Sequence, residues 1–276
     1  MTRTIIITGC SSGIGLDAAQ TLAGRGWRVF ATCRAEADCE RLRGQGLESL
    51  RLDYAHGDSI AAAFETVMER AGRVDALFNN GAYAIPGFVE DLPTEALRAI
   101  FEANFFGWHD LTRRAIPVMR AQGGGRIVQC SSVLGFAAAR WRGAYVASKF
   151  AVEGYTHALR MEMRGTPLHV SLIEPGPIAT RFNDNALAQF RRWIDPARSA
   201  RAAELAAIEA RYGGRGVTST VGRFTLPPAA VTRRLIHAIE SPRPKARYLV
   251  TTPTWAAEML RRFAPLAWMD GVMANN

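Results

Sequence analysis

Two side chains that could carry acid–base chemistry stand four residues apart, at Tyr145 and Lys149. In a helix this spacing places them on one face as neighbours. Of the 34 basic residues only Lys149 and Lys245 are lysines, so we expect Lys149 to supply a compact ammonium that arginine cannot replace. A nearby ammonium stabilises tyrosinate and lowers the phenol pKa from about 10. The pair therefore predicts that Tyr145 acts as a general acid/base near neutral pH, the alternative being a structural tyrosine beside a solvated lysine.

Further polar residues could join this pair. Ser131 and Ser132 follow an apolar run, where a hydroxyl could donate to a substrate carbonyl oxygen, although two serines after a strand more often form a turn. Asn104 lies in an apolar helical stretch, so it is either an internal capping amide or part of a polar relay. No metal-ligand spacing or disulfide framework is present, which predicts no metal and a reduced, cytoplasmic setting. None of the histidines and cysteines of the chain is therefore assigned to a metal site or a disulfide: His56, His109, His157, His169, His237, Cys10, Cys33, Cys39 and Cys130.

A glycine-rich turn directly follows the first apolar run and opens the first helical pattern. At this place free backbone N–H groups bind the pyrophosphate of a dinucleotide. Gly9 would permit the tight turn, Gly13 the close approach of backbone to phosphate, and Gly15 close packing of helix on strand. The residues expected to contact the cofactor here are Gly9, Ser11, Ser12, Gly13, Ile14 and Gly15.

The end of the second apolar run bears on the choice of dinucleotide. An Asp or Glu there would hold the adenosine ribose of NAD, but the chain has Cys33 and Arg34. A guanidinium can bind a 2′-phosphate through two hydrogen bonds. The sequence therefore favours NADP over NAD, unless Arg34 is only a surface charge. Asp53, after the third run, is placed to meet the adenine amino group or merely to cap a turn.

Short β-rich runs alternate with longer helical patterns, as in βαβ units with a parallel sheet. We predict an α/β fold: a three-layer Rossmann fold with a doubly wound parallel sheet of about seven strands, in one domain over residues 1–276. The expected strands are Thr4–Thr8, Trp27–Cys33, Leu47–Asp53, Asp75–Asn79, Arg126–Cys130, His169–Glu174 and Arg247–Val250. The expected helices are Ile14–Arg25, Ser59–Ala71, Thr94–Ala121, Tyr145–Arg164 and Ala229–Ser241.

Two segments fall outside this alternation. Residues 182–226, with a helix around Arg198–Arg211 and a glycine-rich exit, look like a substrate lid inserted between sheet elements. In the extension 252–276, Thr254 could cap a short helix with an apolar stripe, which would dock on the core or on a subunit partner, or rest weakly on a membrane surface. The stripe consists of Trp255, Met259, Leu260 and Phe263.

Composition excludes several classes of protein. With 276 residues, 48% apolar and 21% charged, the chain is neither disordered nor a coiled coil. Seven of its nine net positive charges lie from Phe182 onward, yet no motif or basic-aromatic repeat supports nucleic-acid binding. The N-terminus has no signal h-region, and no apolar run is long enough to span a membrane.

Together these motifs resemble the short-chain dehydrogenase/reductase family, in its single-domain branch. The matching residues run in the family's order from residue 4 to about 180, with one departure: Gly81 and Ala82 are exchanged relative to the usual Asn-Asn-Ala-Gly. They are the glycine turn, Asp53, Asn79-Asn80-Gly81-Ala82, Asn104, Ser132, Tyr145-x-x-x-Lys149 and Pro175-Gly176-Pro177-Ile178-Ala179-Thr180. Three further motifs are similar to the branch of 17β-hydroxysteroid and retinol dehydrogenases and bacterial NADP-dependent aldehyde reductases: Thr32-Cys33-Arg34, Asn104-Phe105-Phe106-Gly107 and Ile173-Glu174-Pro175-Gly176-Pro177.

The resemblance implies an oxidoreductase acting on CH–OH donors, with roles for individual residues. Tyr145 would exchange a proton with the substrate oxygen, Ser132 would hold that oxygen, and Lys149 would lower the tyrosine pKa and bond the nicotinamide ribose, which Tyr145 also adjoins. Asn104 would anchor a water that links Lys149 to solvent. Asn80 would lie along the cofactor, and the carboxamide would be held just after the Pro-Gly turn by a loop with Pro175, Gly176, Ile178 and Thr180.

A lipophilic aldehyde, retinoid or steroid-like ketone, or the matching alcohol, is the expected substrate. Apolar residues of the lid and of the loop before Tyr145 would line the pocket. They are Phe182, Leu187, Phe190, Trp193, Ile194, Val133, Leu134, Phe136 and Trp141. The family implies a homodimer or homotetramer. Two alternatives stay open: a reductase of 3-oxoacyl groups on acyl carrier protein, and a non-catalytic NADP-binding protein.

Overall fold

The computed structural model describes residues 2–214, 222 and 224–274. Seven strands form one parallel sheet in the order β3-β2-β1-β4-β5-β6-β7. The predicted α/β fold with a doubly wound parallel sheet is confirmed, and every predicted strand is present with ends that differ by at most two residues. The strands are β1 Thr4–Thr8, β2 Arg28–Cys33, β3 Glu48–Arg51, β4 Ala76–Asn79, β5 Gly125–Cys130, β6 Leu168–Glu174 and β7 Arg247–Leu249.

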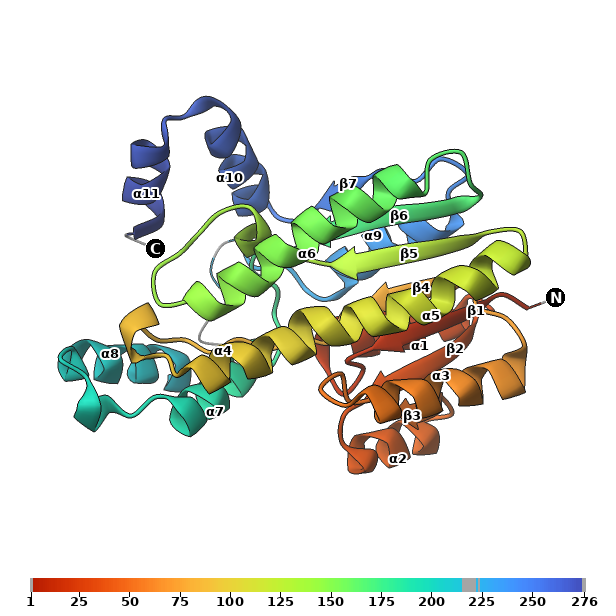
Figure 1. Ribbon diagram of the computed structural model, residues 1–276, viewed down its shortest axis with the longest axis horizontal. Coiled ribbons are helices and arrows are strands. Elements are labelled where there is room, and N and C mark those ends of the chain that lie inside the picture. The colour runs from red at the N-terminus through yellow and green to blue at the C-terminus, as the bar shows by residue number, and fades with distance from the viewer. Residues whose placement is uncertain (1, 215–221, 223, 275–276) are drawn as a thin grey trace.

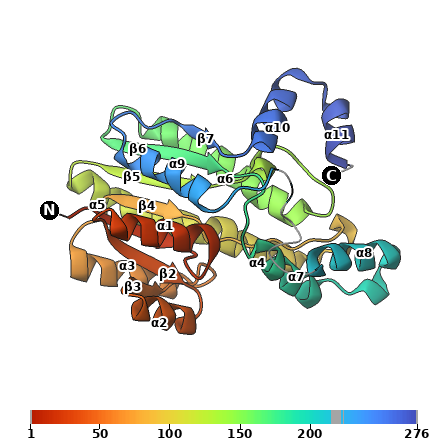
Figure 2. The same cartoon turned by 180° about the vertical axis from the view of Figure 1, so that it is seen from behind.

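Helices cover both faces of this sheet, which gives three layers. The helices α3, α5 and α6 lie on the face seen in Figure 1, whereas α1 and α9 lie on the face seen in Figure 2. The helices are α1 Gly13–Gly24, α2 Glu36–Gly44, α3 Gly57–Ala71, α4 Thr94–Phe101, α5 Gly107–Ala121, α6 Gly143–Glu162, α7 Phe182–Trp193, α8 Ala202–Gly213, α9 Ala229–Glu240, α10 Thr252–Phe263 and α11 Leu266–Ala274.

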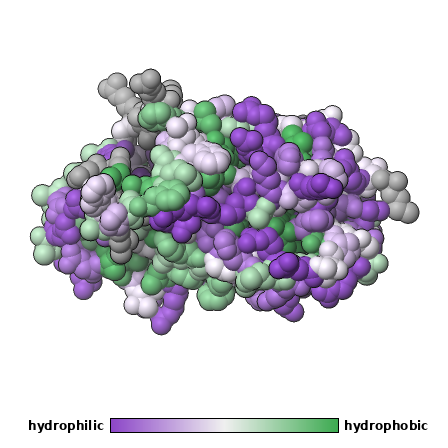
Figure 3. Space-filling view, turned by 90° about the horizontal axis from the view of Figure 1, so that it is seen from above, coloured by the Kyte–Doolittle hydropathy of each residue, from purple (hydrophilic) through white to green (hydrophobic). Residues whose placement is uncertain are grey.

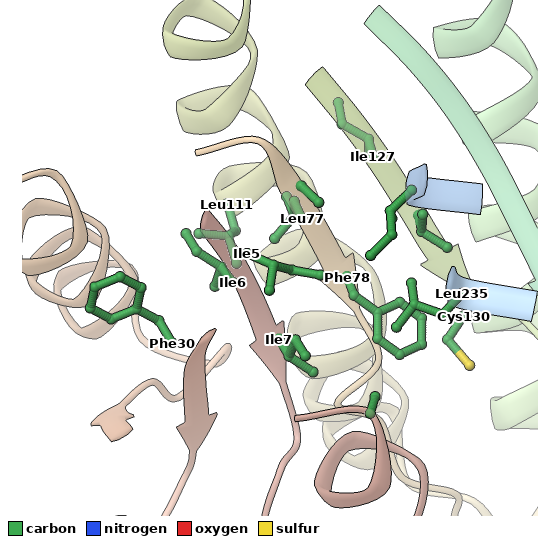
Figure 4. Close-up of a cluster of buried hydrophobic side chains, with 14 of the residues drawn as sticks. Ile5, Ile6, Ile7, Phe30, Leu77, Phe78, Leu111, Ile127, Cys130 and Leu235 are labelled. Carbon is green, nitrogen blue, oxygen red and sulfur yellow. The ribbon is translucent and has the colours of Figure 1, made fainter. Parts of the chain in front are cut away.

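The strand order reverses at β1, which pairs with β2 on one side and with β4 on the other. At such a switch point the loops beyond the two carboxyl ends diverge and leave a crevice where open α/β sheets bind ligands. All five residues of β1 are buried, as a strand covered on both faces requires. Figure 4 shows Ile5, Ile6 and Ile7 at the centre of the apolar cluster that fixes this part of the sheet.

The predicted helix Thr94–Ala121 is interrupted. A π-helical turn at Glu102–Phe106 separates α4 from α5, and Asn104 within it is fully buried. A π turn adds a residue to the helical repeat and occurs often at functional sites. Apolar periodicity does not reveal such an insertion because the residues on both sides remain helical.

Three helices were not predicted: α2, α7 and α11. The helix α2 buries only Cys39 and Leu42, so its sequence has little apolar periodicity. In the expected lid the structure places α7 and α8 in succession rather than one helix around Arg198–Arg211. Residues 215–221 and 223 of that segment, Gly216 of its glycine-rich exit among them, and residues 275–276 of the C-terminal extension lie outside the described residues.

The C-terminal helix α10 differs from the prediction at its start and in the face that it buries. Thr251, not Thr254, is the N-cap, and its side chain accepts a hydrogen bond from the backbone N–H of Thr254. Pro253 in the first turn favours this earlier start because its fixed φ and missing N–H suit that position. Figure 3 shows that hydrophobic residues gather mostly at the end of the molecule that bears α10 and α11.

The predicted docking of the apolar stripe on the core is wrong for most of its residues. Trp255, Met259 and Phe263 are 54%, 40% and 82% exposed, and Leu260 alone packs, against the small cluster around Phe136. The inward face carries Thr254 and Glu258 instead. Contact with a partner or a membrane surface stays a prediction. In the part of the chain that the structure describes, no helix is both long and apolar enough to cross a membrane.

Charged side chains attach α10 to the sheet. Arg247 on β7 donates to Glu174 over 2.8 Å and to Glu258 over 3.0 Å, and both carboxylates are almost fully buried. Beside this network, Gly176 lies so close to α10 that a Cβ atom there would collide with Oγ1 of Thr251. The residues after β6 are therefore fitted directly against the start of α10.

Candidate active site

Tyr145 and Lys149 lie in the first two turns of α6, both buried. The Lys149 ammonium donates to the carbonyl oxygen of Cys130, at the end of β5, over 2.8 Å. It also lies 4.4 Å from the ring centroid of Trp108 and 5.6 Å from that of Tyr145. The structure thus brings the predicted pair together at the carboxyl end of the sheet.

Burial dominates the titration of both groups. It raises the pKa of Tyr145 well above the usual value for a phenol, and the Cys130 thiol adds to this, whereas a hydrogen bond with Ser132 and the Arg142 guanidinium act in the opposite direction. Burial lowers the pKa of Lys149 to about 8. The net shift of the tyrosine pKa is therefore upward, opposite to the expected one, because desolvation disfavours tyrosinate more than nearby charges favour it. The separate contribution of Lys149 stays a prediction.

Ser132 and Ser131 have different surroundings. Ser132 Oγ accepts a hydrogen bond from the backbone N–H of Leu134 over 3.1 Å and lies near enough to the Tyr145 hydroxyl to lower the pKa of that phenol. Ser131 Oγ is buried and has no hydrogen-bond partner among the described residues. Of the two serines, the one placed against Tyr145 is therefore Ser132.

Asn104 acts as an internal capping amide. Its Oδ1 accepts from the backbone N–H of Tyr83 over 3.1 Å, and its Nδ2 donates to the carbonyl oxygen of Tyr83 over 2.9 Å and to Ser148 Oγ over 3.1 Å. These bonds hold the loop after β4 against α6. The expected water relay to Lys149 stays a prediction.

The glycine turn between β1 and α1 has the geometry that a dinucleotide requires. Gly9 and Gly13 adopt left-handed backbone conformations, with φ +69° and +59°, which other residues adopt at a cost. A Cβ atom at Gly15 would collide with the carbonyl oxygen of Gly9, so only glycine allows this close approach of helix and turn. Ser12 is the N-cap of α1 but its side chain makes no capping hydrogen bond. The turn therefore leaves a concave backbone surface and a helix N-terminus free for a pyrophosphate.

Asn80, directly after β4, braces this turn. Its Nδ2 donates to the carbonyl oxygen of Thr8 over 2.9 Å, and its backbone N–H donates to Thr8 Oγ1 over 2.9 Å. Thr8 Oγ1 also accepts from the backbone N–H of Gly81 and from the Tyr54 hydroxyl. Thr8 thus connects three segments around the turn. The sequence did not predict this role, because a buried threonine at the end of a strand gives no signal of its contacts.

The backbones of Gly9 and Gly81 lie close together, and a Cβ atom added to Gly9 would lie 2.6 Å from the Cα atom of Gly81. A Cβ atom added to Gly81 would lie 3.2 Å from the backbone nitrogen of Gly9, which is a tight contact but not a collision. This contact therefore explains the glycine at position 9 and leaves the exchange of Gly81 and Ala82 unexplained.

Arg34 and Asp53 lie at the ends of β2 and β3. The Arg34 side chain is exposed and forms no ion pair within the described ranges. Asp53 Oδ1 accepts from the backbone N–H of Ala55 over 3.1 Å, which is the turn-capping role weighed against adenine contact. An Arg34 guanidinium without a carboxylate partner fits a phosphate better than a ribose hydroxyl.

The loop after β6 crosses the mouth of the site. Pro175 accepts from the backbone N–H of Val133 over 2.8 Å, and Ile178 forms a parallel bridge with Leu226. The methyl group of Thr180 lies against Gly13, 2.9 Å from the place that a Cβ atom there would take. The loop therefore connects the glycine turn, the segment after β5 and the end of the expected lid.

Apolar side chains of the expected lid pack over Tyr145. The ring of Phe182 stands edge-on to that of Tyr145, with centroids 5.3 Å apart. Phe136 is an exception to the predicted pocket, because it packs under α10 rather than beside Tyr145. The other predicted residues share one cluster with Tyr145: Val133, Leu134, Trp141, Phe182, Leu187, Phe190, Trp193 and Ile194.

Comparison with known proteins agrees with this geometry. The family model described as short chain dehydrogenase matches residues 3–190, more than half of the chain. The chain is a short-chain dehydrogenase/reductase. As a member of this family it is an oxidoreductase that binds a nicotinamide cofactor and acts on CH–OH donors, which confirms the predicted family and enzyme class.

Relatives of this short-chain dehydrogenase/reductase include characterised and uncharacterised enzymes. It is 40% identical over 274 residues to the "uncharacterized oxidoreductase YbbO" of Escherichia coli K12, which covers 99% of this chain and 94% of the relative. It is 36% identical over 197 residues to retinol dehydrogenase 8 of Homo sapiens, covering 68% and 62%. A short chain dehydrogenase/reductase from Burkholderia phymatum in complex with NAD has a TM-score of 0.82 at 26% identity, covering 95% and 93%.

Proposed function

We propose that the protein is an NADP-dependent oxidoreductase that interconverts lipophilic aldehydes or ketones and their alcohols. The observation that carries the proposal is the Tyr145 side chain, which lies beside Ser132 and packs in a cluster of apolar side chains. A proton donor set in an apolar enclosure suits a substrate whose carbonyl is its main polar group. The similarity to retinol dehydrogenase 8 supports a lipophilic substrate.

The chain's own residues divide the work of cofactor binding and proton transfer. Gly9, Gly13 and Gly15 would accommodate the pyrophosphate, and Arg34 would hold the 2′-phosphate. The loop after β6 would contact the nicotinamide, which supplies or accepts a hydride when bound. Ser11, Ser12, Ile14 and Asn80 would also line the cofactor, and Asp53 would contact the adenine amino group.

Proton transfer falls to Tyr145. Its raised pKa keeps the phenol protonated at neutral pH, which suits donation to a carbonyl oxygen as the carbon is reduced. Ser132 would hold the same oxygen, and the Lys149 ammonium, fixed by Cys130, would stabilise the tyrosinate that remains. Tyr145 would therefore act as the general acid of the reduction and, as tyrosinate, as the general base of the reverse oxidation.

The test is the loss of reduced-nicotinamide absorbance with NADPH, and separately with NADH, on retinal, long-chain aldehydes, steroid ketones and an acetoacetyl thioester. We expect turnover of a lipophilic carbonyl with NADPH preferred. Tyr145→Phe should lower kcat by ~10³-fold, roughly the contribution of a positioned general acid, and leave NADPH binding unchanged. Tyr155→Phe is the matched control, because Tyr155 lies on the same helix with its hydroxyl bound to His109.

Other outcomes would select the alternatives. Turnover restricted to the acetoacetyl thioester would favour a reductase of acyl carrier protein substrates. NADPH binding without turnover of any carbonyl would favour a non-catalytic NADP-binding protein.

We also propose that the protein is a homodimer or homotetramer in which α5 and α6 meet a second copy. A surface hollow of about 470 Å³ lies between these helices and is lined by Ile116, Pro117, Tyr155 and Leu159 among others. Two exposed apolar side chains lie nearby, Phe106 directly before α5 and Met161 on α6. Light scattering of the protein and of Met161→Glu tests this arrangement, since a charge at the contact should shift the protein toward monomer.

A further inference from the structure

A second arginine lies at the corner where the adenosine end of the cofactor is proposed to bind. Arg41 on α2 donates from Nη2 to the carbonyl oxygen of Ser11, in the glycine turn, over 2.7 Å. Burial raises the pKa of the Cys33 thiol to about 12, and the Arg41 guanidinium is near enough to oppose that rise. The backbone N–H of Cys10 donates to the carbonyl oxygen of Thr32 over 2.9 Å, so the turn that holds Arg41 lies beside the end of β2, which Arg34 directly follows.

The corner is rich in positive charge. Arg51 donates from Nε to the carbonyl oxygen of Arg34 over 3.3 Å, which adds a third guanidinium nearby. One carboxylate faces Arg41, that of Asp38, 2.8 Å from Nη2. The neighbouring Glu36 is engaged elsewhere, by Arg43 over 2.6 Å.

Arg41 keeps donors for a ligand. Both of its hydrogen bonds within the described ranges use Nη2, and a guanidinium carries five N–H donors. Its side chain is 41% exposed, so Nε and Nη1 can meet an anion from solvent. The bond to Ser11 fixes the guanidinium at the turn beforehand, which reduces the ordering that binding requires.

We propose that Arg41 is a second ligand for the 2′-phosphate of NADP, which would lie between the guanidinium groups of Arg34 and Arg41. This inference rests on the proposed use of NADP. A 2′-phosphate is dianionic and accepts several charge-assisted hydrogen bonds, for which arginine is the best donor. NAD has a hydroxyl at this position and gains little from a second guanidinium. Arg41 is therefore a determinant of the preference for NADP over NAD.

The test measures dissociation constants of NADPH and NADH by fluorescence titration for the wild type and for Arg41→Gln, Arg34→Gln and Arg43→Gln. We expect Arg41→Gln to weaken NADPH binding by ~10-fold, as loss of one charge-assisted hydrogen bond predicts, and to change NADH binding by less than about twofold. Arg43→Gln is the matched control: it removes the same charge from the same helix but at a residue bound to Glu36 and to the Ser49 carbonyl. It should change neither constant.

Further outcomes separate the inference from the function on which it rests. Unchanged NADPH binding in Arg41→Gln, with a loss in Arg34→Gln, overturns the role of Arg41 and leaves NADP dependence intact. Equal weakening of NADPH and NADH also overturns it, because Arg41 then only braces the Ser11 turn. A wild type that binds NADH more tightly, with neither variant discriminating, overturns NADP dependence and the inference together.

An additional variant, Asp38→Asn, tests the proposal without removing an arginine. Asp38→Asn leaves all arginines in place and removes the carboxylate that competes with phosphate for Arg41. We expect tighter NADPH binding, by roughly two- to fivefold for removal of a partly exposed charge, at unchanged NADH affinity. Weaker NADPH binding in this variant would contradict the proposal.

Discussion

Replacing Glu174 by glutamine tests whether the carboxyl group at the end of β6 is protonated in the folded protein. Burial raises its pKa to about 8, and the neighbouring Glu153 carboxylate adds to the rise, against hydrogen bonds from Arg247. When folding raises the pKa of a carboxyl group, the protonated group contributes to the free energy of unfolding. This contribution is fully present below the pKa of the unfolded chain and is lost as pH rises through the pKa of the folded protein. Glutamine keeps the shape, stays neutral and can still accept from Arg247.

The size of the stability difference between the wild type and Glu174→Gln follows from the pH range between the unfolded and the folded pKa of this carboxyl group. Between the unfolded pKa of about 4.3 and the folded value, each pH unit removes up to about 1.4 kcal/mol of wild-type stability relative to Glu174→Gln. From pH 5.5 to 7.5 the variant should therefore gain about 2 kcal/mol on the wild type. In a chain of this size that is a relative rise in Tm of roughly 4–8 °C.

Glu258→Gln is the matched control in the same network. Burial alone would raise the pKa of Glu258, but hydrogen bonds from Arg261 and Arg262 and the charge of Arg247 lower it to about 2. Stability from a carboxyl with a lowered pKa is lost only as pH falls below its unfolded value. The loss in Glu258→Gln should therefore be the same at pH 5.5 and 7.5.

The assay is urea unfolding of the wild type and both variants at pH 5.5, 6.5 and 7.5. A difference between Glu174→Gln and wild type that does not change over this range would refute the reasoning, because the carboxyl would then be ionised throughout. A pH-dependent difference in Glu258→Gln would show that the whole network titrates rather than Glu174.

Two further substitutions test how the site is positioned. Gly176→Ala should destabilise the protein by about 1–3 kcal/mol in urea unfolding, because its Cβ collides with Thr251 in a packed region. The double variant Gly176→Ala with Thr251→Ala should lose less free energy of unfolding than the sum of the two single losses. Strict additivity would contradict the contact. Asn104→Ala should lower stability by roughly 1–3 kcal/mol, since the partly buried N–H and carbonyl of Tyr83 lose their partners. A loss below about 0.5 kcal/mol would show that these groups find other partners.

The sheet and the order of motifs along it could be predicted because each depends on local patterns. Buried parallel strands read as apolar runs, and β1 with its three isoleucines is the clearest case. The glycine turn was predictable for the same reason: left-handed backbone and close approach leave a direct mark as Gly9, Gly13 and Gly15.

Features that depend on tertiary contacts were missed. The π turn at Asn104 inserts its residue without breaking apolar periodicity. The inward face of α10 carries Glu258, which is compatible with burial because Arg247, Arg261 and Arg262 donate hydrogen bonds to it. Burial also reversed the expected pKa shift of Tyr145, since spacing in sequence does not reveal the extent of desolvation. Arg41 was overlooked because its contact with Ser11 joins residues 30 positions apart on different elements.

The close fit of Gly176 against Thr251 and Thr254 has a consequence for how such chains can be recombined. The two sides of this fit lie on segments separated by more than 70 positions in the sequence, one after β6 and one at the start of α10. In a chimera whose C-terminal third comes from a relative, the residues at positions 251 and 254 are those that fit the relative's own loop after β6. Exchange of substrate-determining segments among relatives is therefore compatible with this scaffold only when both sides of the fit are transferred together.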